Sequence, residues 1–269
     1  NILFQNIYSF FIGNRAGIVP LGYYTQADKW SKMGVSSLSA IFTQTFLPML
    51  SEYQDQPEKY AATTSRINRL AAYAVFPSFA LLIVTATPIF HALFGTKWDP
   101  SIILFQLLLI RGIFTIITAL YHNYVLSLGR SRLMIVSEII RDGTAVIAII
   151  ATLPYIALSS PENLTEGITI FLWGQVIASV IAWAVMMIIA ARVSWSNPWR
   201  YLYDLLPYAA ISLLIAMGLW WMRDLIANPW LQIAAVSIAG TVIYIGINRM
   251  LGSKIQAEAF AFLRSRFHK

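Results

Sequence analysis

The chain contains no cysteine among its 269 residues, which excludes disulfide bonds, thiol catalysis and cysteine-ligated metal sites. Charged residues are scarce as well: they make up 12% of the sequence, against about 25% in an average soluble domain. The sequence also has no glycine-rich phosphate loop, and its start has neither the basic segment nor the cleavage site of a signal peptide. We therefore expect no cofactor and no metal site.

What the chain has instead is a series of long apolar runs. Hydrophobic residues make up 58% of the sequence, and the mean hydropathy is +0.65. This composition is typical of all-α polytopic membrane proteins. We predict about eight membrane helices, roughly at 1–18, 33–50, 70–94, 101–128, 132–158, 167–191, 205–223 and 229–250. The net charge is +7, but we expect no nucleic-acid partner, because most Lys and Arg residues stand at the ends of these helices.

The distribution of Lys and Arg predicts the orientation of the chain. Twelve of the nineteen basic residues fall in four alternate segments, 51–69, 129–132, 192–203 and 249–269. Because basic loops stay on the cytoplasmic side, we predict a multi-pass protein of the bacterial inner membrane with a cytoplasmic C-terminus.

The last segment, 253–269, is predicted to form a basic amphipathic helix. Ile255, Ala259 and Phe262 recur at i, i+4 and i+7, so they share one face. The basic residues of such a helix contact anionic headgroups, which makes membrane lipids a predicted partner. A solvated tail is the alternative.

The hairpin formed by 101–128 and 132–158 carries charge inside both of its apolar helices. Arg111 lies in the first helix, and Glu138, Arg141 and Asp142 lie in the second. A charge near the middle of a bilayer costs from about 2.5 to more than about 10 kcal/mol. These side chains must therefore face protein, water or a bound polar ligand rather than lipid.

Helical spacing gathers the polar residues of this hairpin onto common faces. Arg111, Thr115, Thr118 and His122 fall at i, i+4, i+7 and i+11 of the first helix. In the second helix Arg141 shares a face with other polar residues, and Glu138 and Asp142 form a neighbouring acidic row. Two polar stripes on adjacent helices predict a hydrated cavity between them.

Three stretches between Leu21 and Trp98 resemble a known family. They read LGYYTQADKW, FLPMLSEYQDQPEKY and PIFHALFGTKW, and SIILFQLLLIRG and the Leu-Gly-Arg turn at 128–130 follow them. Together they resemble Wzx-type flippases of lipopolysaccharide and capsule synthesis, within the multidrug/oligosaccharidyl-lipid/polysaccharide (MOP) superfamily. Beyond residue 160 only the hydropathy is similar to that family.

The resemblance implies a fold and an activity. Such flippases have two six-helix lobes around a cavity, often with two more C-terminal helices. Residues 1–200 would then be the second lobe, 201–252 the two additional helices and 253–269 the tail. The first lobe would be a partner missing from this chain, which agrees with a start at Asn1 rather than Met. The implied activity is alternating-access transport of undecaprenyl-diphosphate-linked oligosaccharide, without catalysis.

The implied substrate gives the charged residues candidate roles. Arg111 and Arg141 suit the diphosphate, because a guanidinium makes forked hydrogen bonds to phosphate oxygens and stays charged. The other interpretation is internal pairing, above all of Arg141 with Glu138 or Asp142. Thr115, Thr118 and His122 would line the same cavity. Glu138 and Asp142 are candidates for binding a coupling ion.

Other functions stay open at this point. A membrane-bound ligase or polymerase of glycan assembly needs a clustered catalytic site, whereas Glu162 and Glu166 have no His or Arg nearby in sequence. An exporter of small cationic molecules needs uncompensated acids, whereas the hairpin has two Arg and two acids. A purely structural subunit would keep buried charges only if all were paired.

Overall fold

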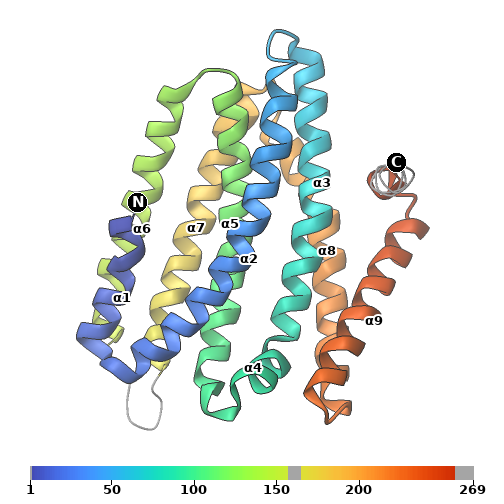
Figure 1. Cartoon of the computed structure of the whole chain (residues 1–269). Helices are drawn as coiled ribbons and strands as arrows, with labels where there is room; N and C mark the ends of the chain where they lie inside the picture. The colour runs from blue at the N-terminus through green and yellow to red at the C-terminus, as the bar shows by residue number, and fades with distance from the viewer. Residues whose placement is uncertain (1, 157–164, 258–269) are drawn as a thin grey trace.

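The computed structural model describes residues 2–156 and 165–257. Nearly all of these residues are helical, and the described chain contains no strand. Figure 1 shows long helices that run up and down a single bundle. The predicted all-α class is therefore confirmed.

The described elements follow one another along the chain in alternating directions (Figure 1). They are α1 (Ile2–Ala16), α2 (Ile18–Ser51), α3 (Pro57–Val84), α4 (Ala86–Phe94), η1 (Thr96–Trp98), α5 (Asp99–Ser127), α6 (Ser131–Ile156), α7 (Glu166–Val193), α8 (Pro198–Met222), η2 (Arg223–Leu225) and α9 (Pro229–Met250).

Six helical segments of the described chain are long and apolar enough to cross a membrane, which confirms a polytopic membrane protein. They are α2, α3, η1 with α5, α7, α8 and α9. The number is smaller than the eight predicted. The first predicted span corresponds to α1, whose 15 residues reach only about 22 Å of the ~30 Å hydrocarbon layer. The fifth corresponds to α6, which is not among the six; its 26 residues reach about 39 Å, so its membrane span stays a prediction.

Two helices begin well before their predicted first residues. The α2 helix starts at Ile18 rather than 33, because Tyr24, Ala27 and Ser31 already bury one face while polar neighbours stay accessible. The α3 helix starts at Pro57 rather than 70, since a proline at the first helical position needs no hydrogen-bonded N–H. Both helices therefore extend past the apolar windows on which the predictions rested.

The predicted helix at 70–94 is divided in the structure into the end of α3 and the short α4. Pro88 cannot donate a hydrogen bond to Val84, so the helical ladder is interrupted there. The amide of Gln106 in α5 donates to the carbonyl of Ile83, one residue before Val84, at 3.0 Å. Thr85 donates to the carbonyl of Leu81, at 2.7 Å. Side chains thus add hydrogen bonds to carbonyls next to the interruption, inside an apolar bundle.

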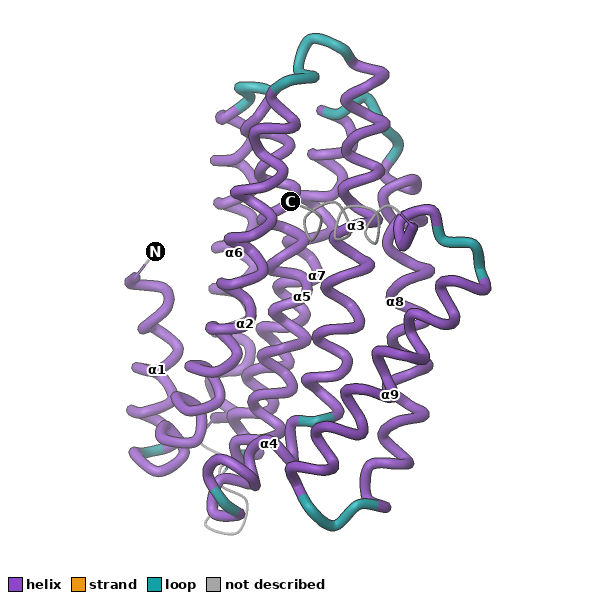
Figure 2. Tube along the Cα trace, turned by 45° about the vertical axis from the view of Figure 1, so that its right-hand side comes forward, coloured by secondary structure: helices purple, strands orange, loops and turns teal. Residues whose placement is uncertain are grey.

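The centre of the bundle is α5, which packs along α2 on one side and α7 on the other. The α6 helix packs mainly on α7, and α8 packs on α3. The α8 and α9 helices lie on the side of the bundle opposite to α1 (Figures 1 and 2). The core includes a group of fully buried tyrosines, Tyr60, Tyr121, Tyr124 and Tyr201, which joins α3, α5 and α8.

The predicted basic segments 51–69, 129–132 and 192–203 gather at one end of the bundle. Figures 1 and 2 show the α2–α3, α5–α6 and α7–α8 connections at the upper end. The α4 helix and the α8–α9 connection lie at the lower end. This arrangement is the alternation that the sequence predicted; that the basic end faces the cytoplasm stays a prediction.

The predicted C-terminal helix falls only partly within the described chain. Ile255 and Gln256 are buried just after the turn at Gly252. The positions that define its apolar face beyond them, Ala259 and Phe262, lie outside the described residues. The division into 1–200, 201–252 and 253–269 also stays a prediction.

The close contact of α6 and α7 at Gly167 makes that glycine sensitive to substitution. A Cβ at Gly167 would overlap the carbonyl oxygen of Tyr155 and lie 2.8 Å from that of Ile156. Because backbone atoms cannot rotate away, we expect Gly167→Ala to destabilise the protein by about 1–3 kcal/mol. Thermal unfolding of the purified protein in detergent measures this effect. The control is Gly143→Ala, because a Cβ there would meet no atom within 4 Å. Its unfolding midpoint should stay the same or rise. Equal unfolding midpoints for the two variants would contradict the close packing at Gly167.

Candidate functional site

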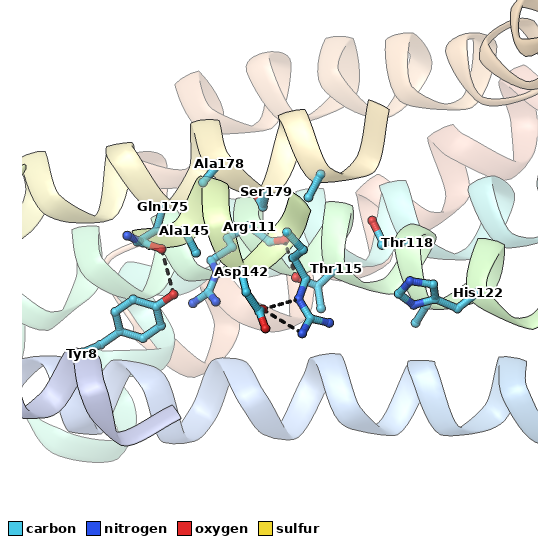
Figure 3. A pocket seen from close by; sticks show the side chains of 13 residues that line it. Tyr8, Arg111, Thr115, Thr118, His122, Asp142, Ala145, Gln175, Ala178 and Ser179 are labelled. Atoms are coloured by element: carbon cyan, nitrogen blue, oxygen red, sulfur yellow. Dashed lines mark hydrogen bonds and ion pairs between the residues drawn. The ribbon is translucent and has the colours of Figure 1, made fainter. Parts of the chain in front are cut away.

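A pocket with a volume of about 290 Å³ opens among α1, α5, α6 and α7 (Figure 3). Its lining combines charged, hydroxyl and small side chains, whereas most of the surrounding helical surface is apolar. The lining residues are Tyr8, Arg111, Thr115, Thr118, Ala119, His122, Arg141, Asp142, Ala145, Gln175, Ala178, Ser179 and Ala182.

The pocket exists because the two helices of the predicted hairpin diverge. The α5 and α6 helices touch each other sparsely, and both pack extensively on α7, which forms the back wall. Ala119 on α5, Ala145 on α6 and two alanines on α7 face the space between them. Small side chains at these positions leave room that larger ones would fill.

Arg141 is held by both acids of its own helix. Its guanidinium donates to Asp142 Oδ1 through Nε at 3.0 Å and through Nη2 at 2.9 Å. It also donates through Nη1 to Glu138 Oε1, at 2.7 Å, and forms an ion pair with the second oxygen of that carboxylate. The structure thus places Arg141 in the internal pairing that the sequence left open.

Arg111 has a different environment. Its guanidinium makes no ion pair with any carboxylate of the described residues, and it stands 5.2 Å from the centre of the Tyr8 ring. Both acids near the pocket are engaged by Arg141. A cation over an aromatic face is stabilised by about 0.5–2 kcal/mol, much less than a carboxylate supplies inside a membrane. Arg111 is therefore available to an anion that enters the pocket.

The depth of Arg111 in the bundle follows from its place in α5. It lies twelve residues after Asp99 in a helix of 29 residues, which corresponds to about 18 Å of a total of ~43 Å. The Cα atom of Arg111 therefore lies near the middle of the span. Figure 3 shows the side chains of Arg111 and Asp142 on the same side of the pocket, pointing toward α2.

The other predicted residues of the first stripe lie farther along the same wall. Thr115 donates to the carbonyl of Arg111, at 3.0 Å, and Thr118 is buried. His122 Nε2 lies 3.0 Å from the hydroxyl of Ser137 and 3.7 Å from Glu138 Oε1. Six of the seven predicted site residues line one pocket, and the seventh, Glu138, contacts two of them from beside it.

The sequence did not predict the part of the pocket that α1 and α7 contribute. Tyr8 on α1 donates to Gln175 Oε1 on α7, at 2.8 Å, and the Gln175 side chain is only 2% exposed. Ser179 follows one turn later on the same face of α7. The sequence pattern that could have indicated this wall is the pair Gln175 and Ser179, an amide and a hydroxyl at i and i+4 within an apolar stretch of helix.

The two acids considered for the enzymatic alternative, Glu162 and Glu166, are not among the described residues that line the pocket. Glu166 begins α7, away from the pocket, and Glu162 lies outside the described residues. What the pocket offers chemically is one unpaired cation, hydroxyl groups and an ion-paired cluster. Such a set suits anionic and hydroxyl-rich ligands.

Comparison with known proteins connects this architecture with a cellular process. Residues 1–103 match a family described as "Polysaccharide biosynthesis protein", and this match includes the segment 21–98 on which the resemblance rests. No curated protein and no solved structure matches the chain. The match relates this multi-pass helical protein to membrane proteins of polysaccharide synthesis or export.

Proposed function

We propose that the protein is a flippase that moves undecaprenyl-diphosphate-linked oligosaccharide across the inner membrane, for lipopolysaccharide or capsule synthesis. The family match to polysaccharide biosynthesis and the six apolar spans support this class of function. The single observation that carries the proposal is Arg111: a guanidinium near mid-span, in an open pocket, with no described carboxylate partner.

The chemistry of the proposed substrate explains why such a cation would be retained. A diphosphate must leave water to cross the hydrocarbon layer, and its desolvation is costly. A guanidinium offsets that cost through forked, charge-assisted hydrogen bonds and stays protonated at every physiological pH. The hydroxyls of Thr115 on α5 and Ser179 on α7 add neutral polar groups to the pocket lining.

The mechanism in this proposal is alternating access. The bundle would pair with a first lobe around a shared cavity, and rocking of the two lobes would expose Arg111 to each side in turn. Glu138 and Asp142 are the proposed sites of ion coupling. Binding of a proton or cation there would compete with Arg141 for the carboxylates, which changes the charge of the pocket.

Two alternatives fit the pocket less well. An exporter of small cations requires a free acid, whereas both acids beside this pocket are paired with Arg141. A ligase or polymerase requires groups that activate a nucleophile and a leaving group; the one described hydroxyl within hydrogen-bond distance of His122, that of Ser137, donates to the carbonyl of Met134 and is not among the residues that line the pocket.

Reconstituted vesicles test the activity directly. The whole protein is placed in vesicles with a fluorescent undecaprenyl-diphosphate oligosaccharide, and an impermeant quencher reports which leaflet holds it. We expect faster exchange between leaflets than in protein-free vesicles, with the recovered lipid unchanged in mass. A longer glycan would instead identify a polymerase, and exchange no faster than in empty vesicles would refute transport of this substrate.

A further inference from the structure

The outward face of α2 differs from every other long exposed face of the bundle. Its exposed residues between Thr25 and Pro48 are mostly polar or small: Thr25, Lys29, Lys32, Met33, Ser36, Ser37, Ala40, Ile41, Gln44, Thr45 and Pro48. They recur every three to four residues and so form one stripe, which we call the α2 polar face. Only 11% of the most apolar window of α2 is buried.

The exposed faces of α6 and α8 show what a lipid-facing surface of this protein is made of. On α6 the exposed side chains include Ile135, Val136, Ile139, Val146, Ile147 and Ile150, and on α8 they include Leu206, Leu213, Leu214 and Met217. These compositions suit hydrocarbon. Serine, threonine and glutamine side chains in hydrocarbon lose their hydrogen bonds to water, which is unfavourable. The α2 polar face is therefore not a lipid-facing surface.

The α2 polar face runs beside the pocket at the same depth. Val35 on α2 packs against Gly112 on α5, directly after Arg111. Two to three turns later, Asn123 on α5 donates to Thr43 on α2, at 3.2 Å, next to His122. The segment from Ser36 to Gln44 is thus level with the pocket from Arg111 to His122.

The pocket lies beside α2, which contributes no residue to its lining. In the described chain α2 and α6 make few or no contacts with each other. The charged residues of α6 are therefore not covered by α2. Figure 3 shows α2 beside the pocket, with Arg111 and Asp142 pointing toward it. A ligand held at Arg111 can extend from the pocket onto α2 without crossing another helix.

We propose that the α2 polar face is the track on which the sugar chain of the substrate lies, while the pocket holds only the diphosphate. This inference rests on the proposed function. The pocket volume of 290 Å³ is at the lower end for sites that enclose a drug-sized ligand, so an oligosaccharide extends beyond it. The hydroxyls of Ser36 and Ser37 donate to the carbonyl of Met33 in their own helix, which leaves their oxygens to accept from sugar hydroxyls. The amide of Gln44 offers both a donor and an acceptor.

Single-cysteine labelling tests whether this face is aqueous, and the chain, which has no native cysteine, needs no prior substitution. Ser36→Cys, Ser37→Cys and Gln44→Cys are compared with Ile139→Cys and Ile147→Cys on the exposed face of α6. In intact membranes we expect a charged, impermeant maleimide to label the three α2 positions at least tenfold faster than the α6 positions. Labelling of α2 as slow as that of α6 would mean that protein or lipid covers the face, and would overturn the proposal.

Binding measurements then separate the sugar track from the headgroup site. The probes are undecaprenyl diphosphate alone and the same lipid carrying the oligosaccharide. We expect the double variant Ser37→Leu with Gln44→Leu to weaken binding of the glycan-bearing lipid about tenfold and to leave the sugar-free lipid unaffected. Ile139→Leu, an apolar exchange on the exposed face of α6, is the control and should change neither.

The Arg111→Ala variant distinguishes the two possible failures. If it weakens both probes while the leucine pair changes neither, the headgroup site stands and the sugar track is wrong. If Arg111→Ala binds both probes as tightly as the unaltered protein, the proposed function itself is wrong. The α2 cysteines could be labelled while the double leucine variant binds both probes normally. The α2 polar face would then be accessible to water but would not bind sugar, and the inference would also be overturned.

Discussion

Replacement of Arg111 by alanine is expected to reduce surface glycan export at least tenfold in a strain that lacks its own flippase. Charge-assisted hydrogen bonds to a phosphate are worth about 1.5–3 kcal/mol, and each 1.4 kcal/mol corresponds to about a factor of ten. Because Arg111 pairs with no described carboxylate, its replacement leaves no carboxylate without a counter-ion. The loss of export should therefore occur at normal abundance of the protein in the membrane.

The Arg111→Lys variant shows whether export depends on the positive charge alone or also on the planar guanidinium group. A lysine keeps the positive charge but cannot form the forked pair of hydrogen bonds, so we expect export between that of the alanine variant and that of the unaltered protein. Export by Arg111→Ala at the normal level would contradict the anion-binding role. A collapse of abundance instead of activity would identify Arg111 as a structural residue.

Arg141→Ala is the matched comparison from the same pocket. Its removal leaves Glu138 and Asp142 close together without their shared cation. We expect the abundance of this variant to fall, because breaking a paired cluster leaves uncompensated charges inside the bundle. Opposite patterns for the two arginines, lost activity at Arg111 and lost abundance at Arg141, would follow directly from their different partners.

The second large effect is expected at Asp204, which joins α8 to α3. Asp204 is 7% exposed; it accepts a hydrogen bond from Ser65 at 2.5 Å and pairs with Arg69 at 3.0 Å. Asp204→Ala would leave the fully buried Ser65 hydroxyl without this acceptor and Arg69 without its counter-ion. Since Arg69 is 39% exposed and can turn toward water, we expect a cost of about 2–3 kcal/mol rather than the full ~3–5 kcal/mol of a buried pair.

Thermal unfolding in detergent measures this cost against a surface pair. Lys32→Ala removes the Lys32–Asp28 pair of α2, in which the lysine side chain is 49% exposed and the aspartate 15%, and should lower stability by no more than about 0.5 kcal/mol because the lysine reaches water. Asp204→Asn keeps the size and one acceptor oxygen, so its midpoint should lie between those of Asp204→Ala and the unaltered protein. A midpoint for Asp204→Ala equal to that for Lys32→Ala would mean that the contact does not hold α8 to the bundle.

The sequence by itself determined the features that depend on composition and on helical periodicity. Apolar runs predicted an all-α membrane protein, and the alternation of basic segments predicted which connections share an end. The spacing of Arg111, Thr115, Thr118 and His122 placed them on one face of one helix, and they line one pocket in the structure. These predictions succeed because neighbours along a helix are related by the fixed geometry of the helix itself.

Only the tertiary structure decided what lies opposite those residues. Tyr8 and Gln175 are 167 residues apart, and Ser65 and Asp204 are 139 residues apart, so no local pattern connects either pair. Because α7 packs against both α5 and α6, a pocket opens between those two helices. Glu138 and Asp142 pair with Arg141, so Arg111 has no carboxylate partner among the described residues. Helix boundaries also depended on packing: α2 and α3 extend beyond their apolar windows, and residues ahead of those windows, such as Tyr24 and Ala27 in α2 and Tyr60 and Thr64 in α3, are buried in the bundle.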